Sequence, residues 1–450
     1  MRALLLALAL ALPAAAQDSP RLLLAQQPNF PLTYPEHLAD NLDYLDALPF
    51  DGITVTVFAS WQLMKPGWTF TAEEIAGSLS PIAGQFERLD YNFLLVTIND
   101  PGDVFDDAAW APVLANWGAL AEAARDAGFA GLFFDVEEYG TTWLNYPEDY
   151  DSPVQSLAAY RKQTRLRGQQ MMEAVAAAWP EAEVLFTFGP WLSEPATPGY
   201  VRLLQVADAE EYELLGPLFV GFLEGAGPGN RIIDGGECYQ YRTAEDFGRA
   251  YAWREVGIAS KNTDSAFIPE ALRPGWGDRV SSGFGVYNID WKAAEGYPMN
   301  PEVMETTLRN ALRRADDLVW YYNEEFADGT GNWHVPGSMP QAWTDAVVAA
   351  QQSPVGVPLG PAAVGEQIAG PFPNPTRGQA TVRLRLDRAA PVRIASRDLL
   401  GRQVALVHAG PLTPGLHRFE MSTKEIPAGT YLVRLQIGDR TETRRLTVLR

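Results

Sequence analysis

Eight short apolar runs, separated by longer segments of helical character, lie between Arg21 and Glu325. This alternation is typical of a parallel sheet built from βα units. Eight runs within about 330 residues fit a (β/α)8 TIM barrel with insertions better than an open sheet. The expected strands are Arg21–Ala25, Gly52–Phe58, Asn92–Ile98, Gly131–Asp135, Glu183–Phe188, Arg231–Asp234, Gly283–Ile289 and Asp317–Tyr322.

The segments between these runs predict the outer helices of the barrel. Trp110–Ala127 and Leu157–Ala178 are long, rich in Ala and free of Pro after their first turns, so both should be helical. Pro301–Arg314 should form the helix before the eighth strand, with Pro301 in its first turn. Leu214–Gly229, crowded with Gly and Pro, is ambiguous and fits a short helix followed by a loop.

The ends of the chain differ in composition from this α/β body, which we expect to span residues 18–352. Residues 1–17 combine a basic start, an apolar run and small residues around Ala16, as in a signal peptide. Pro-rich residues 353–370 predict a linker. Residues 371–450 should form a small all-β sandwich. Its expected strands are Ala380–Leu386, Pro391–Ser396, Leu416–Met421, Thr430–Ile437 and Thr443–Leu449.

The formal charge of −21 is unevenly distributed along the chain. From Pro371 onward 14 Lys and Arg face 6 Asp and Glu, a charge of +8, so the preceding residues carry −29. Such an acidic body repels nucleic acid and anionic surfaces, and neutral or cationic substrates suit it better. The acidity could equally serve solubility alone. No stretch after the signal peptide approaches the ~20 apolar residues of a transmembrane helix.

Four short motifs in the tail occur in the order found in one family of export signals. They are Phe372–Pro375, Asp398–Arg402, Pro427–Tyr431 and Arg444–Leu446. With them the tail resembles the C-terminal sorting domain of the bacterial type IX secretion system. The resemblance implies passage through the periplasm of a Gram-negative bacterium, the type IX machinery as partner, and a secreted or surface-attached product. Strand pattern alone would also fit a carbohydrate-binding or fibronectin-like sandwich.

Acidic residues gather where the apolar runs of the barrel end. In a (β/α)8 barrel the active site lies at the carboxyl ends of the strands. Asp135 and Glu137 are two residues apart at the end of one run, so both side chains should leave the same face. Acids also follow four other runs, among them Asp100, Glu237, Asp290 and Glu324. Each alone could be a helix cap or a solvated loop residue, but together they predict a carboxylate-rich barrel mouth.

Tryptophans form a second set of candidates. All 13 precede Pro354, and several follow strand ends, including Trp61, Trp191 and Trp291. Flat indole faces around a cleft suit sugar rings, although packing within the core explains such positions equally well. A barrel mouth with paired carboxylates and indole platforms predicts chemistry on a glycosidic bond.

The stretch Ala130–Glu137 resembles the family 18 glycoside hydrolase signature Asp-Gly-x-Asp-x-Asp-x-Glu. Gly131, Asp135 and Glu137 match it, whereas Ala130 and Phe133 replace two of its Asp residues. The resemblance implies that Glu137 protonates the leaving oxygen and that Asp135 orients a substrate acetamido group. A different retaining or inverting pair remains open, with Glu137 or Asp135 opposite Glu237 or Glu324 across the barrel mouth.

We therefore expect an exported glycoside hydrolase that acts on a poly- or oligosaccharide. A non-catalytic glycan-binding barrel on the cell surface is the alternative. The catalytic candidates are Glu137, Asp135, Glu237 and Glu324. The substrate-binding candidates are Asp100, Tyr139, Trp61, Trp191, Tyr239, Asp290, Trp291 and Trp320.

Neither a cofactor nor a metal is predicted from the sequence. There is no Gly-rich phosphate loop and no Gly-x-Ser-x-Gly elbow. His37 and His334 are the only histidines before the tail, which argues against a His-built zinc site, while a structural calcium held by carboxylates stays open. Cys238 is the only cysteine, so an intramolecular disulfide is excluded.

Overall fold

The computed structural model forms two compact units, Met1–Gly356 and Val357–Arg450. The expected signal peptide and most of the expected linker lie outside the described residues. Those residues are 20–26, 31–137, 143–145, 155–193, 212–237, 239–257, 268–274, 276–290, 298–352, 367–372, 376, 378–386, 390–398, 402–412, 415–424, 426–438 and 440–449.

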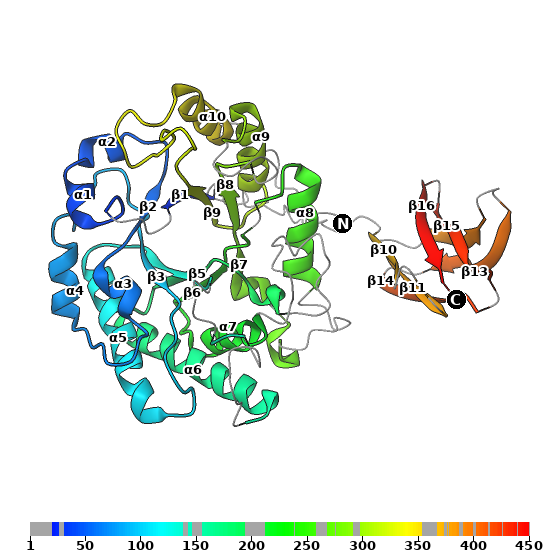
Figure 1. The fold of residues 1–450 in the computed structure, drawn as a ribbon, viewed down its shortest axis with the longest axis horizontal. Coiled ribbons are helices and arrows are strands. Elements are labelled where there is room, and N and C mark those ends of the chain that lie inside the picture. Colours follow the sequence, from blue (N-terminus) through cyan, green and yellow to red (C-terminus); the bar gives the residue numbers. More distant parts are fainter. Residues whose placement is uncertain are drawn as a thin grey trace, which may run out of the picture. The chain divides into compact units, whose positions relative to one another are not determined.

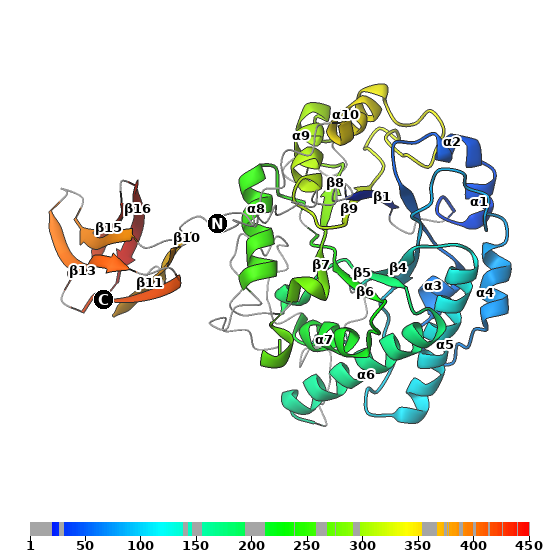
Figure 2. The same cartoon turned by 180° about the vertical axis from the view of Figure 1, so that it is seen from behind.

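The first unit is a barrel of parallel strands surrounded by helices (Figures 1 and 2). The strand order is β7-β6-β5-β4-β3-β2-β1-β9-β8, and every pairing within this sheet is parallel. All eight expected strands are present, which confirms the predicted fold class. The strands are β1 Arg21–Gln26, β2 Gly52–Val55, β3 Phe93–Thr97, β4 Gly131–Asp135, β5 Glu183–Phe186, β6 Arg231–Asp234, β7 Val280–Ser282, β8 Phe284–Tyr287 and β9 Leu318–Asn323.

Helices cover the outside of this sheet, so the strands are buried on both faces and read as continuous apolar runs. β2, β3 and β4 contain only buried residues. Capping residues set several helix starts: Asp106 caps α5, Ser156 caps α6 and Thr243 caps α8. The helices are α1 Pro35–Ala39, α2 Leu42–Asp46, α3 Phe58–Gln62, α4 Ala72–Leu79, α5 Asp107–Asp126, α6 Leu157–Ala178, α7 Leu215–Gly225, α8 Ala244–Ala252, α9 Pro301–Leu312 and α10 Gln341–Gln352.

The predicted helices are present, and their bounds agree with the structure to within three residues. Leu157–Ala178 coincides with α6, and the ambiguous segment is indeed a short helix, α7. α5 begins three residues before the predicted start because Asp106, rather than a residue nearer Trp110, accepts the first backbone N–H groups. No helix of the described residues is long and apolar enough to cross a membrane.

The barrel closes through one strand that changes partners in its middle. β7 pairs with β6, and β8, one residue further along, pairs with β9. Gly283 separates the two halves, and its N–H donates to the carbonyl of Asp234 at 2.8 Å. Gly285 continues the contact by donating to the carbonyl of Gly236 at 3.2 Å. β7 and β8 therefore act as the seventh strand of an eight-stranded barrel.

A buried ion pair holds this seam. Arg254, in the π-helical turn Trp253–Gly257, places Nη1 3.1 Å from Oδ1 of Asp234, and both side chains are at most 3% exposed. Its Nη2 donates to the carbonyl of Gly283 at 2.6 Å. The indole N–H of Trp191 donates to the same Asp234 oxygen at 3.1 Å. Arg254 thus ties β6 to the strand that follows it.

The neighbouring Glu255 binds β7 on the other side of the turn. The hydroxyl of Ser282 donates to Oε1 of Glu255 at 2.5 Å. The pKa of Glu255 is raised to about 7, chiefly by burial; the Ser282 hydrogen bond lowers the pKa and the charge of Asp316 raises it within that net value. Glu255 is therefore held in its protonated form below neutral pH.

The second unit consists of two antiparallel sheets that share one core. One sheet has the order β10-β11-β14, the other β13-β12-β15-β16. Val382 and Leu384 of the first sheet and Ile394, Val433 and Leu435 of the second belong to the same buried cluster. The strands are β10 Gln367–Phe372, β11 Gln379–Leu386, β12 Ala390–Arg397, β13 Gln403–Leu412, β14 Gly415–Ser422, β15 Gly429–Ile437 and β16 Arg440–Val448.

The five predicted strands of this unit are present, and two strands were missed. β10 begins at Gln367, inside the range predicted as linker, and contains Gly370 and Pro371, which mark turns in a sequence. β13 is an edge strand without a fully buried residue. Its sequence therefore lacks the alternation of buried apolar and exposed polar residues by which a strand is predicted.

We expect Gly285→Ala to lower the free energy of unfolding of the barrel by about 1–3 kcal/mol, because a Cβ there would overlap buried ring atoms. That Cβ would lie 2.5 Å from Cζ2 of Trp320. The measurement is urea denaturation followed by tryptophan fluorescence, which reports only on the barrel unit. Gly77→Ala in α4 is the matched control, since nothing lies within 4 Å of its Cβ and it should be stabilising. Equal effects of both substitutions would contradict the packing argument.

Glu255→Gln should make the barrel less dependent on pH. Glu255 has a pKa of about 7 when folded against 4.5 as a free side chain, so folding favours its protonated form. Its stabilising effect is complete below about pH 4.5 and is lost as the pH rises to about 7, a change of about 3 kcal/mol. Denaturation of both proteins between pH 4 and 8 should therefore show the variant gaining stability over the wild type across this range. A constant difference would refute this reading of Glu255.

Candidate active site

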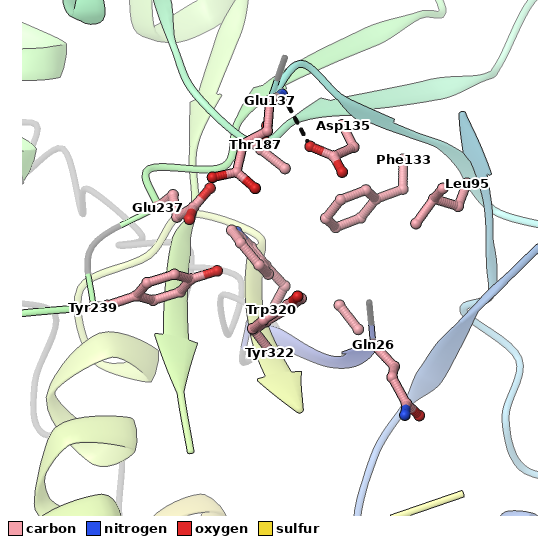
Figure 3. A pocket seen from close by; sticks show the side chains of 11 residues that line it. Gln26, Leu95, Phe133, Asp135, Glu137, Thr187, Glu237, Tyr239, Trp320 and Tyr322 are labelled. Carbon is pink, nitrogen blue, oxygen red and sulfur yellow. Dashed lines mark hydrogen bonds between the residues drawn. The ribbon is translucent and has the colours of Figure 1, made fainter. Parts of the chain in front are cut away.

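A pocket opens at the carboxyl ends of the barrel strands, and three carboxylates line it (Figure 3). Asp135 is the last residue of β4, Glu137 follows it by two residues, and Glu237 follows β6. The strand-end pattern thus brings together three of the four catalytic candidates. The described lining residues are Ala25, Gln26, Leu95, Phe133, Asp135, Glu137, Thr187, Glu237, Tyr239, Trp320 and Tyr322.

Asp135 and Glu137 are fixed by the backbone at the end of β4. Oδ1 of Asp135 accepts a hydrogen bond from the N–H of Glu137 at 3.1 Å. The hydroxyl of Thr187, just beyond β5, accepts from the N–H of Val136 at 3.1 Å. Asp135 is only 5% exposed, whereas Glu137 is half-buried. Asp135 therefore lies at the base of the pocket, and Glu137 is the more accessible of the two.

Glu237 reaches the pocket from β6 through a glycine turn. Gly236 has a φ of +52°, and its N–H donates to Oδ1 of Asp234 at 3.0 Å. The Arg254 guanidinium fills the space beside it, because a Cβ on Gly236 would lie 2.1 Å from Nη1. The N–H of Glu237 donates to the carbonyl of Thr187 at 3.1 Å. The ion pair at the barrel seam thus also sets the position of Glu237.

The carboxyl groups of Glu137 and Glu237 point toward one another in the pocket (Figure 3), and the charge of Glu137 raises the pKa of Glu237 in addition to its burial. They come from strands that are not neighbours, since β5 lies between β4 and β6. Two carboxyl groups within one cavity are what the cleavage of a bond between two sugar units requires.

Aromatic side chains form the opposite wall. The indole N–H of Trp320 donates to the carbonyl of Gly235 at 2.8 Å, which anchors this ring in the glycine turn. Tyr239 and Tyr322 stack with centroids 5.9 Å apart, and Tyr287 lies 4.6 Å from Tyr239. Trp320 and Tyr239 were predicted as substrate-binding residues, and both line the pocket.

Burial and mutual repulsion raise the proton affinity of this cluster. Burial raises the pKa of Asp135 well above its ordinary value, and the charge of Glu137 adds to the effect. Burial likewise raises the pKa of Glu237, with further increases from Glu137 and Asp135 and a decrease from the Tyr239 hydrogen bond. The pKa of Tyr322 is raised by burial and by all three carboxylates. Three acids this close do not all ionise at neutral pH, so the cluster retains a proton.

The remaining candidates do not line the described pocket. Glu324 lies beyond the end of β9, where its N–H donates to Oδ1 of Asn288 at 2.9 Å, and burial raises its pKa. The exposed Asp100 accepts from the N–H of Gly102 at 2.8 Å and forms a turn. Asp290 lies near Arg242: burial lowers the pKa of this guanidinium, and the charge of Asp290 opposes that effect.

Two predicted indole platforms have other environments. Trp191 is fully buried and donates to Asp234, so the expectation that it stacks on sugar was wrong: its ring is part of the core at the barrel seam. Trp61 is partly buried, and its carbonyl accepts from the side chain of Asn99 at 3.0 Å. Tyr139 and Trp291, with Cys238, lie outside the described residues.

Four polar or aromatic lining residues were missed by the sequence analysis. Gln26, Thr187 and Tyr322 lie at or just after the ends of β1, β5 and β9, and Phe133 lies within β4. The signal was their place at strand ends, but an uncharged side chain at such a place does not stand out from the apolar run. Among the described residues, no group of three or more His, Cys, Asp or Glu is arranged to hold a metal ion.

Solved structures similar to the chain are barrels of more than one activity. They include a β-1,4-D-mannanase from Cryptopygus antarcticus, with 10% identity, coverage of 74% of this chain and 89% of that one, and a TM-score of 0.38. A family 18 chitinase from Pseudoalteromonas aurantia has 13% identity, coverage of 73% and 99%, and a TM-score of 0.34. A 3-keto-D-glucoside 4-epimerase from E. coli has 15% identity, coverage of 73% of this chain and 98% of that one, and a TM-score of 0.35. Similarity at this level carries no argument about activity.

The tail is identified by its own sequence. No curated protein has a sequence that matches this chain. Residues 371–449 match the family of secretion system C-terminal sorting domains, which confirms the resemblance drawn from the four motifs. The match implies the type IX secretion machinery as a partner, and with it export to the cell surface or beyond. The second unit of this chain is therefore a secretion system C-terminal sorting domain.

Proposed function

We propose that the barrel is an exported glycoside hydrolase that cleaves a poly- or oligosaccharide. The observation that carries this proposal is the convergence of Asp135, Glu137 and Glu237 in one pocket with an aromatic wall. Hydrolysis of a glycosidic bond needs one carboxyl group to protonate the leaving oxygen and a second carboxylate to act as nucleophile or base.

Glu137 is the proton donor in this proposal. It is the most accessible of the three acids, whereas Asp135 and Glu237 are 5% and 2% exposed. Glu237 faces Glu137 and is the second carboxylate, as nucleophile for retention or as base for inversion, in the state of the coupled cluster in which Glu137 carries the proton and Glu237 is ionised. Burial raises the pKa of Asp135 well above its ordinary value, which favours its neutral form and so limits the negative charge that builds up when Glu137 gives up a proton.

The charge of the site restricts the substrate. The described lining residues include three acids and no Lys or Arg. Residues before Pro371 carry a formal charge of −29 within a chain of −21. A sulfated or uronic acid polymer would be repelled from such a site, so we expect a glycan that is neutral or carries amino groups. The proposed role of the tail is to deliver this barrel outside the cell.

Replacing the two facing acids should separate their roles. The substrates to screen are starch, barley β-glucan, galactomannan and chitosan. On the polymer that the wild type cleaves, Glu137→Gln should lower kcat by about 10²–10⁴-fold, because the leaving oxygen is no longer protonated. On an aryl glycoside of the same sugar, whose leaving group needs no proton, the variant should keep its first step. Glu237→Gln should lose turnover on both substrates. Reducing-sugar and phenolate release are the measurements.

Glu324→Gln is the matched control, since Glu324 does not line the described pocket and should retain turnover. NMR of the first product shows whether the anomer is retained or inverted. Full turnover in Glu137→Gln would overturn the assigned chemistry. Binding of a polysaccharide without cleavage by the wild type would instead identify a non-catalytic glycan-binding barrel.

A further inference from the structure

Three neighbouring aromatic side chains, two of them exposed, form a cluster on the barrel that we term the aromatic ridge: Phe58, Trp68 and Phe70. Phe58 is 47% and Trp68 42% exposed. Among the described barrel residues, Phe58 and Trp68 are the large aromatic side chains that stand out into solvent, and their ring centroids lie 5.1 Å apart. Phe70 is partly buried and packs against the core. Exposed aromatic rings that gather in one place are a mark of a binding surface.

The ridge is held in a fixed shape. Trp68 and Phe70 lie nearly parallel, with 3° between the ring planes and 6.0 Å between centroids. The buried Asn116 of α5 fastens the loop that carries them: its Nδ2 donates to the carbonyls of Leu63 and Trp68 at 2.9 and 3.0 Å. Its Oδ1 accepts from the N–H of Phe70 at 2.8 Å. Rings held in advance lose little conformational entropy when a ligand binds.

The ridge lies at the same end of the barrel as the carboxylates. Phe58 begins α3, which follows the carboxyl end of β2 (Figure 1). The hydroxyl of Thr97, the last residue of β3, donates to the carbonyl of Ser60 in α3 at 3.1 Å. Thr97 is also the register partner of Asp135. One strand therefore connects the helix that carries the ridge to the acid at the base of the pocket.

Ring chemistry selects the ligand. Flat aromatic faces bind the C–H faces of pyranose rings, and they provide no charge to recognise an ionic group. A polymer whose scissile bond lies in the pocket must continue past the barrel mouth on at least one side. We propose that the aromatic ridge is a remote subsite that binds a sugar unit of the same neutral or amino-bearing chain. This inference rests on the proposed hydrolase function.

The test compares long and short substrates in the full-length protein. Trp68→Ala should lower the ratio of kcat/KM on the polymer to kcat/KM on the aryl glycoside by about three- to tenfold, as expected for the loss of one stacking contact. Trp68→Tyr keeps a flat ring and should restore most of the ratio. Val303→Ala in α9 is the matched control, because Val303 is also exposed, at 42%, but lies on a different helix.

Binding provides a second measurement. The intact polysaccharide that the wild type cleaves is cast into a gel for affinity electrophoresis of proteins that carry Glu137→Gln. The gel should retain the protein more weakly when Trp68→Ala is added and equally when Val303→Ala is added. Suppose that Glu137→Gln abolishes cleavage but Trp68→Ala changes neither the kcat/KM ratio nor the retention in the gel. This result would overturn the proposed subsite and still support the proposed hydrolase. If no glycan is cleaved but Trp68→Ala weakens binding of one, the hydrolase is wrong and the ridge is supported. A dimer in sedimentation that Trp68→Ala dissociates, without an effect on glycans, would identify the ridge as a contact between copies and overturn the proposal.

Discussion

The structure depends on how its barrel closes. A single strand serves two neighbours in turn, and the exchange at Gly283 leaves the carbonyl groups of Asp234 and Gly283 beside a buried guanidinium. Arg254 satisfies them and neutralises Asp234 in the same place. A buried charge is tolerated only when it is paired and hydrogen-bonded, so each partner makes the other possible. The glycine turn that follows can then carry Glu237 inward without strain, because its φ of +52° falls on a glycine.

The contacts at this seam also determine the electrostatics of the pocket. Its three acids lie at or just beyond the ends of β4 and β6, whereas the guanidinium of Arg254, beside Gly236, is paired with Asp234 and donates to the Gly283 carbonyl. The site therefore has buried acids with little positive charge to stabilise them, and their pKa values rise. A cluster of buried acids that retains a proton is suited to general-acid chemistry, and in the proposed function Glu137, the most accessible member, passes that proton to the leaving oxygen.

The sequence predicted those parts of the fold and the site that depend on local pattern. The barrel strands are buried on both faces, so their apolar runs are plain, and acids that end such runs stand out; Asp135, Glu137 and Glu237 were found in this way. Uncharged residues such as Thr187 and Tyr322 carry no comparable signal. Trp191 shows the reverse failure: it follows a strand end, yet its environment is set by Asp234, 43 residues away in the chain. Contacts made by residues this distant depend on the closed barrel, which a local pattern does not encode.

The floor of the pocket has a consequence for how this protein could evolve. Trp320 contacts Phe133 in the middle of the barrel and donates to the backbone of the glycine turn, while its ring leaves no room for a side chain at Gly285. A new shape at this floor would disturb the packing that keeps the barrel folded. If the proposed function holds, inherited change in sugar preference is confined to the rim, where α3 and its loop are anchored by Asn116 and Thr97 rather than by the core rings. Descendants of this barrel should share their floor and differ in their rims.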